Sequence, residues 1–308
     1  MSEQPMILHH YDASPYAEKI RLMFGIAEVD WQSVLSPPQP PRPNVDPLTG
    51  GYRRIPVAQA GADIFCDTVL IASEVAAMTG RESLRSEISD ETARELAIKA
   101  EGEMFFAAIT SVPPRKLLGT LLGNFGLLGA LRFMKDRSAM MRDATVKPLQ
   151  GKAAVTAFAA FQAELNEHLS HQKFLAGDSV SYADLCVYHP LWLQLRVGKT
   201  ALPPEYQHLA QWFARVESSG QGHRHEVAPE AAFAAARAAD PRPLPEAVQD
   251  DQNTGRQVSV APVDYGRNPV EGELVAVTDD RLIVARRTDA FGTLHVHFPR
   301  ARFEVTAA

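Results

Sequence analysis

A serine and a proline stand at positions 14 and 15, between an apolar strand-like run and a helix-like one. The residues before them, "MILHHYD", are typical of a short strand, and Ile20, Met23 and Phe24 recur at helical spacing after them. Ser14 is therefore expected at the N-terminus of a helix, where a hydroxyl and free backbone N–H groups favour a bound anion. The simpler interpretation is a helix cap worth about 1 kcal/mol, since serine is a favoured N-cap residue and proline is favoured after it.

Two further sites also stand at the ends of structural elements. In "RRIPV", Pro56 lies between Ile55 and Val57 at the start of a strand. Proline removes a ladder donor there, so it is expected either as a cis bond kept for shape or as an edge residue. In "FCDTVLIASEVA", Asp67 and Thr68 begin a helix, either as a cap or as groups that hold an anion.

The first 80 residues position these three sites within one small α/β unit. Their pattern predicts, in order, a strand, a helix, a strand, a loop, two strands and a helix. These segments are 6–11, 15–26, 29–36, 37–51, 55–60, 63–68 and 69–80. Proline and glycine content predicts the loop, Gly61 indicates a hairpin, and Gly80 is expected as a C-cap.

The rest of the chain divides into a helical part and a strand-rich tail. Helical patterns cover 89–240 without a fixed repeat, and Pro113 and Pro190 are expected to end or kink helices. A proline-rich, acidic linker (241–255) then leads to stretches in which apolar and polar residues alternate. A tail of about 55 residues is small for a domain, so we expect it to pack against its neighbours.

Composition narrows the classes of function. The chain has 308 residues, of which 45% are hydrophobic and 22% charged, which is ordinary for a globular protein. A net charge of −6 gives no general attraction to nucleic acid or anionic lipid. No apolar run approaches the length that spans a bilayer, and the start lacks a secretory pattern. Two cysteines are too few for a disulfide framework. We therefore expect a cytoplasmic protein that binds neither nucleic acid nor membrane.

The order of elements and motifs resembles the glutathione transferase superfamily over about residues 1–220. The resembling segments are "SPYAEKIR", "RRIPV", "CDTVLIASEVA" and "FLAGDSVSYADLCVY", the last with a capping box at Ser181 and Asp184. The first is most similar to the serine-type classes, such as tau and zeta. The resemblance implies an α/β thioredoxin-like N-terminal domain (1–82) and an all-α C-terminal domain (88–240). The small antiparallel β extension (250–308) is unusual for the family, and its role is not indicated.

The resemblance also implies roles for single residues. Ser14 is the catalytic residue that hydrogen-bonds the glutathione sulfur. The backbone of Ile55, with a cis Pro56 and Val57 beside it, binds the cysteinyl part of the tripeptide. Asp67 and Thr68 hold its γ-glutamyl end. Glutathione is then a co-substrate, no metal is required, and the partners are a small-molecule electrophile and a second copy in a homodimer.

Physical chemistry supports these roles. A thiolate is the nucleophile, and a thiol with a pKa of about 8.5 is mostly protonated at neutral pH. A hydroxyl donor and a helix N-terminus both favour the anion, and lowering its pKa by about two units requires roughly 2.7 kcal/mol. The Asp67 carboxylate can pair with the γ-glutamyl ammonium, and the Thr68 hydroxyl with helix amides can receive the carboxylate.

Some residues depart from the family pattern. Asp67 is one methylene shorter than the usual Glu, and Thr68 adds a methyl group to the usual Ser. The loop 36–43 is rich in proline where the family often has a lysine that touches glutathione. An arginine could replace that lysine. The candidates are Arg42, Arg53 and Arg54, and the sequence alone does not distinguish them.

Histidines and cysteines elsewhere have simpler explanations. His9 and His10 point to opposite sides of a strand, so one is expected in the core and one at the surface. Cys66 and Cys186 are expected as inert packing residues. Two histidines in the tail share a strand face and could take part in a metal site, but no third ligand is evident. They are His295 and His297.

The predicted function is that of a glutathione transferase whose bound thiolate attacks an electrophilic carbon. An apolar wall for the acceptor is expected from the helical part, although ordinary helix core explains these residues equally well. They are Phe105, Phe106, Phe133, Met134 and Met140. Two alternatives stay open, because fold does not fix function. One is a glutathione-transferase-like binding or scaffold protein without turnover, and the other is a glutathione-dependent isomerase.

Overall fold

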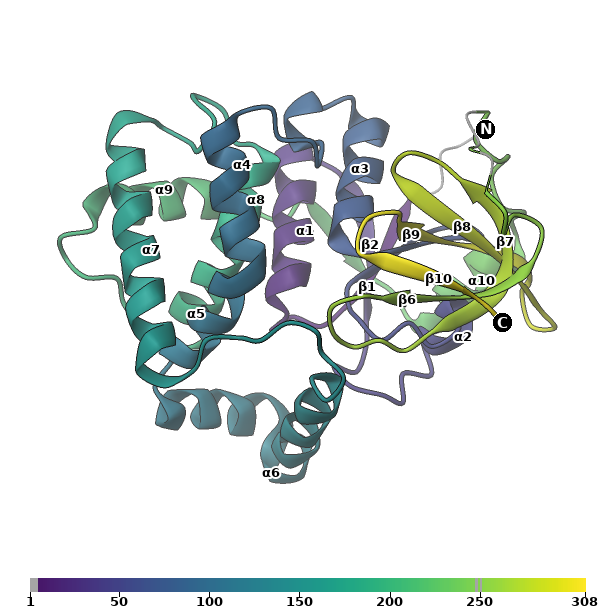
Figure 1. Ribbon diagram of the computed structural model, residues 1–308, viewed down its shortest axis with the longest axis horizontal. Coiled ribbons are helices and arrows are strands. Elements are labelled where there is room, and N and C mark those ends of the chain that lie inside the picture. Colours follow the sequence, from purple (N-terminus) through teal and green to yellow (C-terminus); the bar gives the residue numbers. More distant parts are fainter. Residues whose placement is uncertain (1–4, 247–248, 250) are drawn as a thin grey trace.

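The N-terminal part alternates strands and helices in the predicted order (Figure 1). The computed structural model describes residues 5–246, 249 and 251–308. The loop contains one short helix that the sequence pattern does not predict, Asp46–Thr49. The elements are β1 (Met6–His10), α1 (Pro15–Ala27), β2 (Asp30–Leu35), α2 (Asp46–Thr49), β3 (Val57–Ala60), β4 (Asp63–Cys66) and α3 (Thr68–Thr79).

Local signals explain where the two helices that carry candidate residues begin and end. Ser14 caps α1, because its side chain accepts a hydrogen bond from the Ala17 N–H at 3.2 Å, and Pro15 occupies the first helical position. Asp67 caps α3 in the same way by accepting from the Val69 N–H. Gly80 ends α3 with φ of +66°, as its predicted C-cap role requires.

The helical part follows the predicted pattern with shifted boundaries. The long helix predicted before Pro113 is interrupted by a wider turn, η2, at Ala100–Met104, where Gly102 has non-helical backbone angles and the helix is kinked. Pro190 lies in the last turn of α8, which is followed by a second wide turn, η3. The elements are η1 (Glu82–Leu84), α4 (Glu91–Lys99), η2 (Ala100–Met104), α5 (Phe105–Ser111), α6 (Pro114–Met140), α7 (Gly151–His171), α8 (Tyr182–Trp192), η3 (Leu193–Val197), α9 (Gln207–Glu217) and α10 (Pro229–Arg237).

Helix α6 differs most from its prediction. It begins directly after Pro113 and turns sharply at Gly126, where φ is +66° (Figure 1). By length and composition alone α6 could cross a membrane, and only 11% of its most apolar window is buried. The prediction that no apolar run approaches this length is therefore wrong, because residues 117–131 carry no charge.

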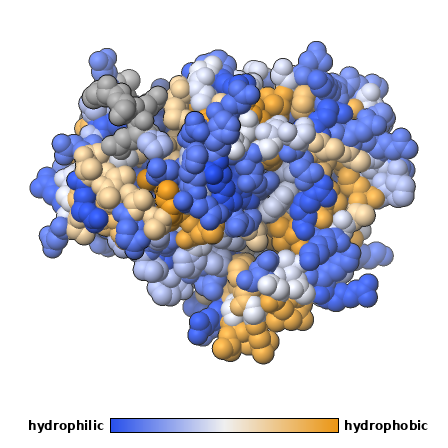
Figure 2. All heavy atoms as spheres, turned by 180° about the vertical axis from the view of Figure 1, so that it is seen from behind, coloured by the Kyte–Doolittle hydropathy of each residue, from blue (hydrophilic) through white to orange (hydrophobic). Residues whose placement is uncertain are grey.

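Much of α6 is exposed at the surface of the protein. Figure 2 shows an apolar surface at the lower edge of the molecule, where α6 lies in Figure 1. Its exposed large side chains are Leu118, Leu122, Leu127, Leu128, Leu131 and Met134.

The β extension continues the N-terminal sheet. Strand β9 pairs in parallel with β4, and a short strand after the helical part, β5, pairs in parallel with β2 at the opposite edge. The resulting ten-stranded sheet has the order β10-β6-β7-β8-β9-β4-β3-β1-β2-β5. The tail therefore packs against its neighbours, as its small size predicts. Its strands are β6 (Gln257–Pro262), β7 (Val270–Val277), β8 (Arg281–Thr288), β9 (Gly292–Pro299) and β10 (Phe303–Ala307), and β5 is His223–Glu226.

Both faces of the N-terminal sheet are covered. One core joins α1 and α3 to the helical part, and a second core joins β3 and β4 to the extension. Helix α10 covers the outer face of β1, where its Ala232 packs with Ile7 and Val34. His9 and His10 are consequently both fully buried, so the expectation that one of them lies at the surface is wrong.

Candidate functional site

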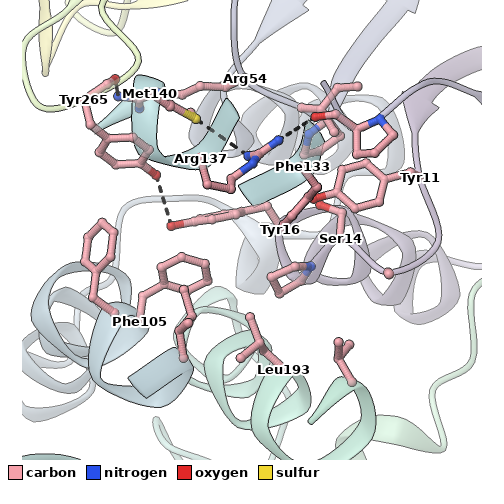
Figure 3. A pocket seen from close by; sticks show the side chains of 18 of the residues that line it. Tyr11, Ser14, Tyr16, Arg54, Phe105, Phe133, Arg137, Met140, Leu193 and Tyr265 are labelled. Carbon is pink, nitrogen blue, oxygen red and sulfur yellow. Dashed lines mark hydrogen bonds between the residues drawn. The ribbon is translucent and has the colours of Figure 1, made fainter. Parts of the chain in front are cut away.

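A cavity of about 480 Å³ opens between the N-terminal part, helices α5 and α6, and the extension (Figure 3). This volume falls within the range of about 300–1,000 Å³ that is common for small-molecule sites. Five of the six predicted site residues line it: Ser14, Ile55, Pro56, Asp67 and Thr68. Val57 is the sixth. It lies fully buried in β3, paired with β1 and β4, and is not part of the cavity wall.

Ser14 places a hydroxyl on the cavity wall at the N-terminus of α1. Its side chain is almost fully buried, and its oxygen accepts the Ala17 N–H. Because that oxygen acts as an acceptor within the protein, its hydrogen remains available to a ligand. The first-turn N–H groups of α1 add a partial positive charge at the same point. The arrangement therefore suits a bound anion such as a thiolate.

The start of β3 presents the backbone of Ile55 to the cavity. The Ile55–Pro56 peptide bond is cis, as the family resemblance implies. Val57 then pairs with His9 of β1 and Cys66 of β4, so the strand is fixed directly after the proline. Ile55 itself precedes the strand, and its backbone groups are free of the sheet ladder.

Asp67 occupies a strained backbone position at the start of α3. Its φ of +76° and ψ of 141° are rarely adopted by residues other than glycine, and such strain costs on the order of 1–3 kcal/mol. Strain of this kind is concentrated at functional sites. One carboxylate oxygen caps α3, and the other lies 3.7 Å from the Arg54 guanidinium.

Two of the three arginines that the sequence could not distinguish line the cavity. Arg54 stands beside Asp67 and pairs with Asp264 of the extension. Arg53 pairs with Asp136 of α6. Arg42 instead lies buried against Asp46 and the Tyr52 carbonyl, and is not part of the cavity wall. Arg53 and Arg54 are thus the candidates for contact with a ligand carboxylate.

The helical part supplies an apolar wall. All five aromatic and methionine side chains expected there line the cavity. Figure 3 shows Phe105 and Phe133 on opposite sides of the space in front of Tyr16. Apolar side chains of α6 and of the turn after α8 extend this wall, among them Leu121, Phe125, Leu193 and Val197.

Three cavity residues come from the extension and were not predicted from the sequence. Asp264 and Tyr265, in the turn after β6, and Arg302, before β10, all line the cavity. No local signal marks Asp264 and Tyr265, because they meet Arg54 and Tyr16 only through contacts that span more than 200 residues.

A buried ionic group beneath the cavity was also missed. Glu101, which lines the cavity, pairs with the fully buried Lys19, and Lys19 also donates to the Tyr182 hydroxyl at 2.9 Å. His189 packs against Tyr16 with ring centroids 4.8 Å apart and the rings tilted. Burial, and then the Lys19 charge, lowers the pKa of His189 to about 3, so this ring is neutral at neutral pH.

The two cysteines are packing residues, as expected. Both are free and buried. Burial raises the pKa of the Cys66 thiol and of the Cys186 thiol, so neither forms a thiolate readily. Cys66 precedes Asp67 directly but faces the core that the N-terminal part shares with the extension.

The tail histidines meet Asp63 across the β4–β9 pair. The ligand atoms of Asp63, His295 and His297 lie within 4.8 Å of one another, so the structure supplies the third side chain that the sequence did not show. The Asp63 oxygens, however, already accept from His297 Nε2 at 2.8 Å and from the Arg242 N–H at 2.9 Å. Arg242 and Arg281 line the same hollow, and their positive charges oppose the binding of a metal cation there. This group therefore serves as a link between the extension and β4.

Comparison with known proteins identifies the family. The family model of the "Glutathione S-transferase, N-terminal domain" matches residues 8–81, and that of the "Glutathione S-transferase, C-terminal domain" matches residues 129–219. A GST-like protein from Pseudomonas syringae is 33% identical over 98% of this chain and 99% of its own, with a TM-score of 0.76. The chain therefore belongs to the glutathione transferase superfamily. Its fold is the thioredoxin-like domain and all-α domain of that superfamily with an added β extension.

More distant structures match a smaller share of the chain. A glutathione S-transferase from Methylobacillus flagellatus with GSH bound is 19% identical over 70% of this chain and 98% of its own, with a TM-score of 0.46. Gtt2 from Saccharomyces cerevisiae is 17% identical over 68% of this chain and 95% of its own, with a TM-score of 0.49. No curated protein matches the chain.

Proposed function

We propose that the protein is a glutathione transferase that binds glutathione in this cavity, with its sulfur beside Ser14. The observation that carries the proposal is the convergence of Ser14, Ile55, Asp67 and Thr68 on one cavity whose opposite wall is apolar. The Ser14 hydroxyl and the α1 N-terminus would stabilise the thiolate, which attacks an electrophilic carbon of an apolar acceptor. Holding both reactants in one cavity lowers the barrier further.

Charged groups at the start of α3 suit the γ-glutamyl end of the tripeptide. That end carries an ammonium and a carboxylate. Asp67 offers a carboxylate to the ammonium, while Arg54, Thr68 and the α3 N-terminus offer donors to the carboxylate.

Ser14→Ala is expected to lower kcat/KM for a panel of electrophiles by about tenfold or more, because the thiolate loses one donor. Steady-state rates with glutathione at several pH values measure this, and the pH at which the rate reaches half its plateau should rise. Asp90→Ala is the matched control, because Asp90 caps α4 through the Ala93 N–H at 2.7 Å and lies outside the cavity. Equal loss in both variants would leave Ser14 as a cap only.

Asp67→Ala is expected to weaken glutathione binding by about tenfold, because an ion pair with the γ-glutamyl ammonium is lost. Isothermal calorimetry measures the Kd, and thermal unfolding measures the cost of the lost cap, expected at about 1 kcal/mol. An Asp67→Asn variant keeps the cap and removes the charge, so it separates the two effects. Unchanged affinity in both variants would contradict the γ-glutamyl assignment.

The same experiments address the two alternatives. A scaffold protein would bind glutathione without turnover of any electrophile, and an isomerase would return glutathione unchanged with a rearranged product. Ser14 and an apolar wall line the same cavity, and this favours a transferase over a scaffold protein without turnover.

We also propose domain boundaries at 1–82, 88–240 and 250–308, a cytoplasmic location and a homodimer. Two free, buried cysteines are consistent with a reducing compartment. The exposed leucines of α6 form an apolar surface that a second copy would cover. Light scattering after gel filtration measures the mass in solution, and a mass of one chain at micromolar concentration would contradict the dimer.

A further inference from the structure

Helix α6 turns one side to the cavity and another to solvent. Leu117 and Leu121 line the cavity from its first half, and Phe133 and Met140 line it from its second half. Five exposed leucines, named here the outer leucines, lie on the solvent side, where large apolar side chains in a group mark a binding surface. The outer leucines are Leu118, Leu122, Leu127, Leu128 and Leu131.

The turn at Gly126 makes α6 unsuitable for crossing a bilayer. Its φ of +66° and ψ of 179° are adopted almost only by glycine. The parts on either side, 114–125 and 127–140, are each shorter than the ~20 residues that span the hydrocarbon. Leu127 and Leu128 follow the turn directly and have exposed fractions of 67% and 68%. Such a pair of short helices suits an interface, where a helix lies on the surface with its apolar side inserted.

Basic side chains border the outer leucines at both ends. Arg115 precedes Leu118 by three residues, and Lys135 follows Leu131 by four, so helical spacing puts each basic side chain on the side of its leucine. Arg132 adjoins Leu131 in the chain. All three basic residues are exposed, and Figure 2 shows hydrophilic side chains beside the apolar ones at this edge. An apolar side with a basic border is typical of helices that lie in a membrane interface.

Helix α6 also concentrates positive charge in an acidic protein. Residues 114–140 contain five basic residues and one acidic residue, a net charge of +4. The whole chain has a net charge of −6, so the remainder carries −10. The one acidic residue of α6, Asp136, is paired with Arg53 of the N-terminal part. An anionic surface is therefore attracted to α6 and repelled by the rest of the protein, which orients α6 toward it.

We infer that the outer leucines and their basic border bind the surface of an anionic phospholipid membrane. The leucines enter the boundary of the acyl chains, and the basic side chains pair with the phosphate groups. The second copy proposed above would cover the same leucines, but a two-fold contact brings identical surfaces together and places like charges opposite one another. Anionic lipid neutralises those charges and is therefore expected to displace the second copy.

Flotation of the full chain with vesicles tests the inference. One set of vesicles is phosphatidylcholine alone, and the other has equal parts of phosphatidylcholine and phosphatidylglycerol. Leu127→Asn/Leu128→Asn removes apolar groups, and Arg132→Gln/Lys135→Gln removes two charges. Ile98→Asn is the matched control, because Ile98 is an apolar side chain of α4 with an exposed fraction of 58%. Thermal unfolding of each variant should match the wild type, since all these side chains are exposed.

The wild type is expected to float with the vesicles that contain phosphatidylglycerol and not with phosphatidylcholine alone. Each double variant should weaken the apparent Kd for the anionic vesicles by about tenfold or more. The Ile98→Asn control should match the wild type. Sodium chloride at about 1 M, where the Debye length is about 3 Å, should weaken wild-type binding by a similar factor.

Equal flotation with both vesicle compositions, or an equal loss in the Ile98→Asn control, would overturn the inference. Flotation of the wild type with neither composition would also overturn it. If the mass in solution is then that of two chains and falls to one chain in Leu127→Asn/Leu128→Asn, the surface belongs to the second copy. These readouts do not involve turnover, so the proposed transferase function is tested separately.

Discussion

Acidification from pH 6.5 to about 4.5 is expected to unfold the protein, because three histidines are buried in neutral form. Burial lowers the pKa of His9 to about 4 and, with the charge of Arg21, that of His10 to about 3. Burial, with Lys19, lowers the pKa of His189 to about 3. Each histidine has a pKa near 6.5 in the unfolded chain, so below that pH the unfolded state binds more protons than the native state.

The sign and size of the effect follow from this difference. The contribution of the three neutral histidines to the free energy of unfolding is fully present above about pH 6.5. It is lost as the pH falls from there toward their native-state pKa values. Each group contributes up to about 1.4 kcal/mol per pH unit in this window, and three groups approach about 4 kcal/mol per unit. Total stabilities are about 5–15 kcal/mol, so two pH units should suffice. Urea unfolding at a series of pH values measures the slope.

Hydrogen bonds assign the tautomers of the neutral His9 and His10 rings. His10 Nδ1 accepts from the Arg21 guanidinium at 3.0 Å, which leaves Nε2 to donate to the Ser33 hydroxyl. His9 Nε2 donates to the Gln59 carbonyl oxygen at 2.9 Å, because the Gln59 amide nitrogen is itself a donor to two carbonyls. Protonation of His10 would place a second cation against Arg21.

His189→Phe provides the discriminating variant. Within the part of the chain that the structure describes, neither ring nitrogen of His189 makes a hydrogen bond of good geometry, so phenylalanine can take its place among the rings of Tyr16 and Phe105 at small cost. The slope of stability against pH should fall by about one third. His171→Gln is the control, because His171 is largely exposed. A stability that stays constant between pH 7 and pH 4.5 in the wild type would contradict the prediction.

Short stretches of sequence were enough to predict several residues of the site. Ser14, Asp67 and Gly80 are helix ends that a short stretch of sequence specifies by itself, through a cap or a left-handed backbone position, and all three lie where predicted. For Pro56 the local sequence left a cis bond and an edge position both open, and the family resemblance implied the cis bond that the structure shows. Such features depend on a few neighbouring residues, so the sequence contains the information needed to predict them.

Long-range features were not predictable in the same way. Tyr265 meets Tyr16 across 249 positions, and nothing in "PVDYG" indicates that contact. The alternation rule predicted one exposed side for β1, but α10 covers that side. The polar "HRHE" of β5, which pairs with β2, likewise gives no strand signal. Parallel pairing of β9 with β4 is another such case, since the tail pattern alone indicates an antiparallel unit.

Removal of the extension is expected to abolish folding of the remaining chain rather than activity alone. A chain that ends at Pro245 would expose the core that the extension shares with the N-terminal part. The side chains on the N-terminal side of that core include Val45, Leu48, Tyr52, Val57 and Ile64, all almost fully buried. Exposing such a side chain costs roughly 1.5–3 kcal/mol, so the loss is comparable with the whole stability of a typical domain. Soluble yield and far-ultraviolet circular dichroism measure the outcome.

A cleaved full-length chain separates docking from folding. With a protease site introduced at 246–250, the two pieces should stay together after cutting, because the β4–β9 ladder, the Asp63–His297 hydrogen bond and the Arg281–Glu74 ion pair all cross between them. Gel filtration of the cut protein should therefore show one peak, with separation only in denaturant. The exposed β4 edge would otherwise present unpaired backbone groups to other chains. A piece 1–245 that elutes alone, folded and with full turnover, would mean that the extension is an appendage and that neither Asp264 nor Tyr265 belongs to the site.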